Sequence, residues 1–156
     1  MNGHIDRRLT ELGIALPQRT TPAGAYVSYV RTGRFVFISG QLPREDGAVT
    51  CVGKVGAEVD EHTAKKAARL CAINILSQLR DACDGHLDRV RRCVRLNGAV
   101  NSDPRFGRQP VVLDGASELM VDVFGTAGQH TRVAVGVAAL PSGASVEVDA
   151  IFEVDD

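Results

Sequence analysis

The sequence predicts a mixed α/β (α+β) fold, because strand-like and helix-like patterns alternate along the 156-residue chain. Near the C-terminus, 131–137 and 146–152 alternate apolar and polar residues, which indicates two β-strands. Between Asp60 and Cys83, apolar residues repeat at helical spacing opposite a charged side, which indicates a long amphipathic helix. This chain length suits one hydrophobic core, so we expect a single domain.

Composition and charge exclude several classes of protein. The hydrophobic fraction is 44%, the charged fraction is 24% and the formal net charge is -1, which is typical of a globular protein. The chain lacks both the basic excess of a nucleic-acid binder and the low hydrophobicity of a disordered chain. Residues 1–17 are too charged for a signal peptide, and no stretch is apolar for long enough to span a membrane. We therefore expect a cytoplasmic protein that binds neither nucleic acid nor membrane.

The four cysteines form no CxxC pair and have no histidine at zinc-ligand spacing. We therefore expect reduced thiols in apolar positions, and no bound metal. No P-loop, dinucleotide-binding, zinc-protease or serine-hydrolase motif occurs in its required context, so we also expect no cofactor. The cysteines are Cys51, Cys71, Cys83 and Cys93.

The N-terminal segment predicts a short helix and an irregular connection. Apolar residues from Ile5 to Leu16 can dock a helix over Asp6–Leu12 onto the rest of the protein, and two prolines and a glycine then interrupt regular structure. We expect residues 1–25 to form an extension and residues 26–156 to form the domain.

Two apolar runs, Tyr26–Arg31 and Arg34–Ser39, flank a Thr-Gly turn and predict a β-hairpin. The second run leads into Ser39-Gly40-Gln41, where glycine permits a close approach of the backbone to another group. Residues 42–57 are rich in glycine, proline and charge, so we expect a loop with a short strand near Val49–Val52.

Capping signals define both long helices. Asp60 or Thr63 can cap the start of the first helix, and Gly85 suits the left-handed position after its end. Asp114 can cap a second helix that ends at Gly125. Between the helices, the pattern over 90–100 predicts a strand with two distinct faces. We expect Val94, Leu96 and Val100 on one face and Cys93, Arg95 and Asn97 on the other.

The closing strands carry charged side chains on one parity and apolar side chains on the other. Arg132 occupies the polar parity of the first strand, and Glu147 and Asp149 that of the second. Arginine presents paired donors that match a carboxylate, whereas the simpler interpretation is an ion pair between Arg132 and Glu147 or Asp149. His130 shares the strand parity of Arg132, and we expect the other histidines at the surface. The apolar parity holds Val133, Val135, Val137, Val146, Val148, Ala150 and Phe152.

Several segments together resemble the RidA/YjgF family, also called the endoribonuclease L-PSP family. The resemblance extends from Tyr26 to the C-terminus and includes the N-terminal helix. It implies a chorismate-mutase-like fold, in which two helices cover one face of a mixed sheet. It also implies a homotrimer whose subunits join through the other sheet faces, with ligand clefts between neighbours. The segments are Ser39–Gln41, Cys71–Leu76, Gln109-Pro110, Asp114–Ser117, Val123–Gly125, Arg132–Pro141 and Val146–Ile151.

The resemblance also implies roles for single residues. Arg132 corresponds to the arginine that holds the substrate carboxylate, and Tyr26 and Ser39 correspond to cleft residues. Glu147 corresponds to the glutamate that positions or deprotonates the attacking water. Arg132, Glu147 and Asp149 are then expected on the face away from the helices, at an inter-subunit surface.

Two positions depart from the family pattern. Ala134 replaces the cysteine that members of the deaminase branch carry, and Asp114 replaces an asparagine common near the second helix start.

The resemblance implies hydrolysis of reactive enamines or imines to a 2-keto acid and ammonia, with an imino acid or other small carboxylate as the ligand. Because Ala134 replaces the thiol, the alternative is a non-catalytic trimer that binds a small carboxylate as a sensor or partner protein. Ribonuclease activity, which the older family name suggests, is disfavoured because the chain has no basic stripe and no recognisable acid–base histidine pair.

Overall fold

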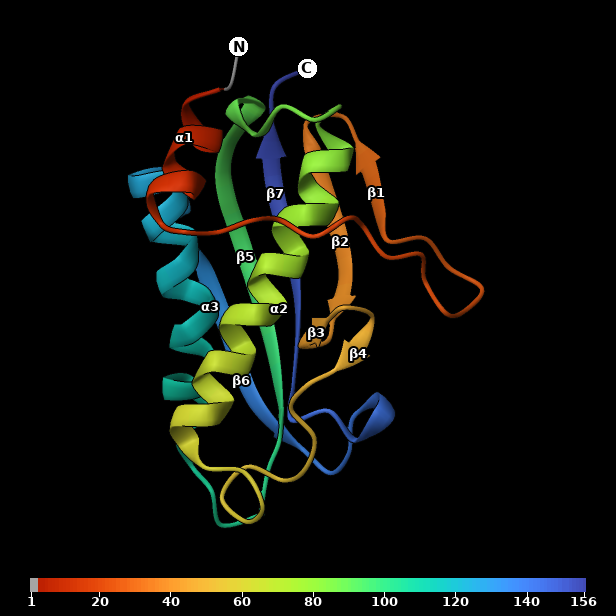
Figure 1. The fold of residues 1–156 in the computed structure, drawn as a ribbon, viewed down its shortest axis with the longest axis vertical. Helices are drawn as coiled ribbons and strands as arrows, with labels where there is room; N and C mark the ends of the chain where they lie inside the picture. The colour runs from red at the N-terminus through yellow and green to blue at the C-terminus, as the bar shows by residue number, and fades with distance from the viewer. Residues whose placement is uncertain (1–2) are drawn as a thin grey trace.

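A five-stranded mixed sheet, covered on one face by two long helices, forms the body of the protein (Figure 1). The computed structural model describes residues 3–156. The strand order is β1-β2-β7-β5-β6, in which β5 and β6 run parallel and the other neighbours run antiparallel. This arrangement confirms the predicted fold class. The five strands are β1 (Tyr29–Thr32), β2 (Phe35–Gln41), β5 (Val90–Asn101), β6 (Thr131–Val137) and β7 (Val146–Val154).

The helix predicted between Asp60 and Cys83 is confirmed as α2 (Glu61–Ala82). The Asp60 carboxylate caps it by accepting the backbone N–H of Thr63 at 2.7 Å. Gly85 follows its end with a φ of 87°, which is the left-handed conformation that glycine adopts without strain. The remaining elements are α1 (His4–Glu11), β3 (Arg44–Glu45), β4 (Ala48–Val49), η1 (Leu87–Arg89), α3 (Gln109–Phe124), η2 (Gly125–Gly128) and η3 (Pro141–Gly143).

The core lies between the sheet and the two helices. A glycine on α3 lets the two helices approach closely: a Cβ atom at Gly115 would lie 2.0 Å from the backbone oxygen of Lys65 on α2. All four cysteines are free and buried, which confirms their predicted use as small apolar residues. No helix within residues 3–156 is long and apolar enough to cross a membrane.

The predicted bounds of three elements are wrong. Helix α3 begins at Gln109, five residues before the predicted cap Asp114, because Pro110 fits the first helical turn. Asp114 therefore lies inside the helix. Strand β1 begins at Tyr29, so Tyr26 precedes the strand. The short strand expected near 49–52 is β4, which pairs with β3 and ends at Val49.

The predicted faces of β5 are wrong over its first half. Cys93 and Leu96 are both buried, whereas Val94 is half-buried. The pairing of β5 with β7 shifts register between Cys93 and Arg95, so a β-bulge reverses the alternation there.

The orientation of β6 also differs from the prediction. Arg132 pairs with Leu96, a fully buried residue beneath the helices, so Arg132 faces the helix side of the sheet. Val133 and Val135 face the other side, where they are 39% and 48% exposed. Strand β6 is at the sheet edge, where a charged side chain can reach solvent and α3 at once. Period-two alternation indicates two faces but does not indicate which one a helix covers.

The N-terminal extension packs against the rest of the protein. Helix α1 begins at His4, where Asp88 of η1 accepts the backbone N–H groups of His4 and Ile5, each at 2.8 Å. The chain then crosses α2 and leads to β1 (Figure 1). The Ser77 hydroxyl of α2 donates to the carbonyl of Pro17 at 2.7 Å, which fixes this crossing. Residues 1 and 2 of the predicted extension lie outside the described residues.

Candidate functional site

Glu147 lies on the face of the sheet away from α2 and α3, which we call the open face. A register shift between Ile38 and Gln41 inserts a bulge into β2 next to β7. The bulge brings Gly40 against the Glu147 carboxyl group, so that a Cβ atom at Gly40 would lie 2.2 Å from Glu147 Oε1. The predicted close approach at Gly40 is thus an approach to the candidate catalytic glutamate.

The Glu147 carboxyl group is half-buried and has no hydrogen-bond or ion-pair partner within residues 3–156. Burial raises the pKa of Glu147, and the nearby negative charge of Asp149 raises it further. Asp149 itself accepts a hydrogen bond from Asn97 Nδ2 at 2.8 Å, and Asn97 Oδ1 accepts one from Arg95 Nε at 2.9 Å. Glu147 is therefore suited to exchange a proton with a ligand.

The structure brings four of the predicted site residues together on the open face. Tyr26, Ser39, Glu147 and Asp149 line one cavity of about 610 Å³. Tyr26 is 57% exposed, and the Ser39 hydroxyl donates to the carbonyl of Val27 at 2.7 Å. These side chains surround space that a small molecule could occupy.

Arg132 does not join this group within one chain. Its Nη1 donates to Asp114 Oδ1 at 2.8 Å and to Ser117 Oγ at 3.1 Å, so its ion pair is with α3 and not with Glu147 or Asp149. Its Nε and Nη2 atoms donate to no acceptor in the described part of the chain, and one edge of the guanidinium fork remains available.

His130 belongs to the Arg132 group, as their shared strand parity predicted. Its Nδ1 donates to the carbonyl of Gly128 at 2.6 Å, so in the neutral ring Nε2 accepts the Ser117 hydroxyl at 2.9 Å. Ser117 thus links His130 to Arg132. Ala134 packs against the core and offers no chemistry to either group.

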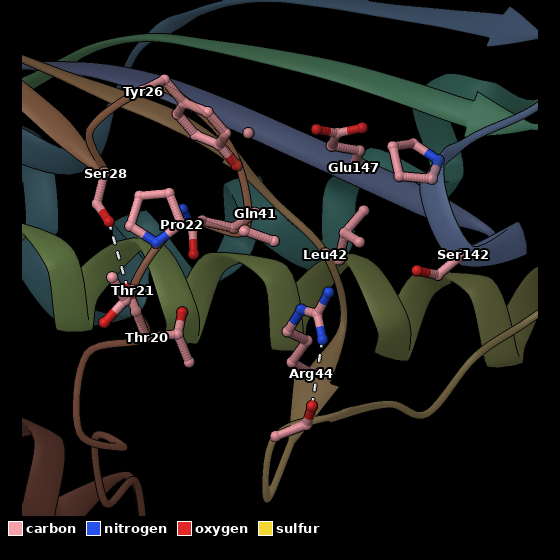
Figure 2. Close-up of a pocket in the computed structure, with 14 residues that line it drawn as sticks. Thr20, Thr21, Pro22, Tyr26, Ser28, Gln41, Leu42, Arg44, Ser142 and Glu147 are labelled. Carbon is pink, nitrogen blue, oxygen red and sulfur yellow. Dashed lines mark hydrogen bonds between the residues drawn. The ribbon is translucent and has the colours of Figure 1, made fainter.

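A second cavity of about 380 Å³ opens beside Glu147 at the end of β2 (Figure 2). Residues 20–23 of the N-terminal extension form one wall, and Arg44 of β3 and Ser142 of η3 lie across from it. Sequence reasoning missed Arg44 and the extension. Residues 42–57 show no periodicity, so the sequence carried no signal that the Arg44 side chain faces the same space as Glu147.

The groups that line the two cavities beside Glu147 indicate what kind of ligand they could hold. The larger cavity combines the carboxyl groups of Glu147 and Asp149 with hydroxyl and amide groups, and the smaller one combines that of Glu147 with hydroxyl and amide groups. Both linings suit a small polar organic ligand. Within residues 3–156, no three His, Cys, Asp or Glu side chains lie close enough together to bind a metal ion.

Comparison with known proteins identifies the family of this chain. Residues 6–153 match the family model described as YjgF/chorismate mutase-like, putative endoribonuclease. The Trypanosoma cruzi protein TCP17 is 47% identical over 156 residues, which cover 99% of this chain and 97% of that protein.

Two solved structures extend the comparison. The Agrobacterium tumefaciens protein Atu1372, of unknown function, is 47% identical with a TM-score of 0.90, and the match covers 97% of this chain and 92% of that one. RidA from an Antarctic Psychrobacter species is 27% identical with a TM-score of 0.59, over 88% of this chain and 94% of that one. The chain therefore belongs to the YjgF/chorismate-mutase-like family, which includes RidA.

Proposed function

We propose that the protein hydrolyses reactive enamines or imines of amino acids, releasing ammonia and a 2-keto acid. The observation that carries this proposal is the half-buried carboxyl group of Glu147, which has no partner within residues 3–156. Its pKa is raised, and it lines a cleft with Tyr26 and Ser39. Such a group can both accept and return a proton, as imine hydrolysis requires. Membership of the family that includes RidA supports this choice of reaction.

In the proposed reaction, the Glu147 carboxylate removes a proton from a water molecule while the water oxygen bonds to the iminium carbon. Glu147 then returns that proton to the nitrogen of the tetrahedral intermediate. The carbon–nitrogen bond then breaks, and the departing ammonia takes the hydroxyl proton as the carbonyl group forms, so that Glu147 is left as a carboxylate. An enamine enters the same sequence after protonation at carbon. Tyr26 and Ser39 would orient the imine beside Glu147.

Arg132 would bind the substrate carboxylate from a neighbouring subunit. Within one chain it lies on the opposite side of the sheet from Glu147, but it is on the edge strand, where a second subunit can approach. The open face carries large exposed apolar side chains, which favours its burial by a partner. We therefore propose a homotrimer in which the β6 edge of one subunit adjoins the open face of the next. The exposed apolar residues are Val30, Phe35, Phe37, Val133 and Val135.

One observation favours a second function. Ala134 replaces the family cysteine and packs against the core, so this position supplies no reactive group. A trimer that binds a small carboxylate without turnover would fit this substitution. Calorimetric titration with a 2-keto acid, showing binding while the hydrolysis assay shows no acceleration, would select this alternative.

The proposed hydrolysis is tested with an imine that an amino-acid oxidase generates in situ, by measuring ammonia release with and without the protein. We expect Glu147→Gln to lower the acceleration by about 100-fold or more, because it removes the proton-transfer group. Glu153→Gln is the matched control, since Glu153 lies on the same face of β7 but pairs with Arg34 at 3.2 Å. Equal activity of Glu147→Gln and the native protein would refute the assignment.

A further inference from the structure

The cavity that the N-terminal extension walls, hereafter the Arg44 chamber, has opposite charges at two separate places. Among the residues that line it, Arg44 and Glu147 are the charged ones, and they form no ion pair with each other. The rest of its polar lining includes Thr20, Thr21 and Ser142 (Figure 2). The proton-transfer group thus shares one space with a cation that the reaction does not use.

The Arg44 guanidinium has donors available for a ligand. Its Nη1 donates to the carbonyl of Gly47 at 3.1 Å, and no carboxylate pairs with it within the described residues. Its acidic neighbours, Glu45 and Asp46, are exposed and make no ion pair with it. The Nε and Nη2 atoms therefore keep the geometry that matches a carboxylate.

Buried contacts fix the backbone that carries Arg44. Asn74 of α2, which is 8% exposed, donates through Nδ2 to the carbonyls of Leu42 and Arg44, each at 3.1 Å. The amide of a largely buried residue thereby ties β3 to the main helix. The position of Arg44 in the chamber follows from this anchoring and does not depend on a free loop.

The opposite wall is also tied to α2. The carbonyl of Thr20 accepts hydrogen bonds from Gln78 Nε2 at 3.2 Å and from Ser28 Oγ at 3.3 Å. Gln78 is 1% exposed and Ser28 is 6% exposed, so the wall rests on buried groups. Buried hydrogen bonds therefore hold both the Arg44 wall and the Thr20 wall in place before a ligand binds.

We infer that the Arg44 chamber receives the side chain of the substrate and selects side chains that end in a carboxylate. The preferred substrates would be imines of dicarboxylic amino acids, with Arg44 as the residue that determines specificity. This inference rests on the proposed function for the position of the reacting carbon beside Glu147. The α-carboxylate is left to Arg132, so each carboxylate of the ligand has its own guanidinium. A neutral side chain of similar length would leave the Arg44 donors unmatched.

The test compares imines that oxidases generate from glutamate and from norvaline, with hydrolysis measured for both. We expect the native protein to favour the glutamate-derived imine in kcat/KM by about 10- to 100-fold, the effect of one charge-assisted contact. Arg44→Gln should abolish this preference, because it should lower kcat/KM for the glutamate-derived imine far more than for the norvaline-derived one, and Arg44→Lys should restore part of the preference. Arg19→Gln is the matched control, because Arg19 lies in the extension, pairs with Asp81 at 3.4 Å and does not line the chamber.

A binding measurement separates this inference from the proposed reaction. Calorimetric titration should show tighter binding of 2-ketoglutarate than of 2-ketovalerate to the native protein, and equal binding of both to Arg44→Gln. This result would support the chamber's specificity even if neither imine were hydrolysed, in which case only the proposed function would fail. An equal loss for both ligands in Arg44→Gln would overturn the inference, because Arg44 would then hold the α-carboxylate. Unchanged selectivity in Arg44→Gln would overturn it too.

Discussion

Gly40→Ala should displace the proposed catalytic carboxyl group without unfolding the protein. The added Cβ atom would lie 2.2 Å from Glu147 Oε1, whereas an ordinary contact between carbon and oxygen is about 3.3 Å. The carboxyl group must therefore move by roughly 1 Å, a displacement that can cost about 100-fold in rate at a reacting centre. The fold should tolerate the change, because the group that moves is the end of a flexible side chain and Gly40 has no positive φ.

The assay for Gly40→Ala is the acceleration of ammonia release from an imine generated in situ, together with thermal unfolding. We expect activity to fall by about 100-fold, while the free energy of unfolding changes by less than about 1 kcal/mol. Gly107→Ala is the control, because nothing lies within 4 Å of its added Cβ atom. Full activity in Gly40→Ala would show that the position of the Glu147 carboxyl group does not matter, which would refute the reasoning.

Three further predictions follow from single contacts. The negative charge of Asp149 helps to raise the pKa of Glu147, so Asp149→Asn should lower that pKa. Because Glu147 acts as a base only when ionised, the acid limb of the pH profile of kcat/KM should then move to lower pH. An acid limb that does not move would exclude Glu147 as the base. Gly115→Ala places a Cβ atom 2.0 Å from the backbone oxygen of Lys65 and should lower stability by about 2–3 kcal/mol in denaturant titration, whereas native stability would contradict the tight helix contact. Asp88→Ala removes the carboxylate that accepts the first N–H groups of α1 and should lower the stability of that helix by about 1 kcal/mol. Amide hydrogen exchange should then become faster across α1 but not across α2.

Strong local signals predicted much of the fold. The length and apolar stripe of α2, its cap at Asp60 and the turn at Gly85 all agree with the structure, because each depends on contacts within a few residues. The alternation in β7 is also confirmed: its buried positions run from Val146 to Val154. These features are local in sequence, so a single sequence contains the information that specifies them.

The wrong predictions depend on contacts between distant residues. Arg132 was expected on the open face with Glu147, but its partners, Asp114 and Ser117, come from a helix that the sequence alone does not place. The bulge at Cys93 reverses the faces of β5 without any glycine or proline to mark it. Alternating apolar and polar residues indicate that a strand has two faces. Which face packs against a helix is known only from the tertiary structure.

The candidate site was predicted in part. The family resemblance indicated Tyr26, Ser39 and Glu147, and the structure brings these residues into one cavity. The resemblance did not indicate Arg44. This residue lies at the site because Asn74, 30 positions further along the chain, holds the backbone of β3 in place. Such a residue becomes visible only once the fold is known.

The central claim is that Glu147 of one subunit acts on a carboxylate held by Arg132 of another, and mixing two inactive variants tests it most directly. Glu147→Gln and Arg132→Ala are unfolded together, refolded into mixed oligomers and assayed for imine hydrolysis. If the cleft is shared, about one quarter of the clefts in an equimolar mixture combine an intact Arg132 with an intact Glu147, so activity should return to that level. Activity that stays at the level of the separate variants would contradict the claim, because both groups would then have to belong to one chain.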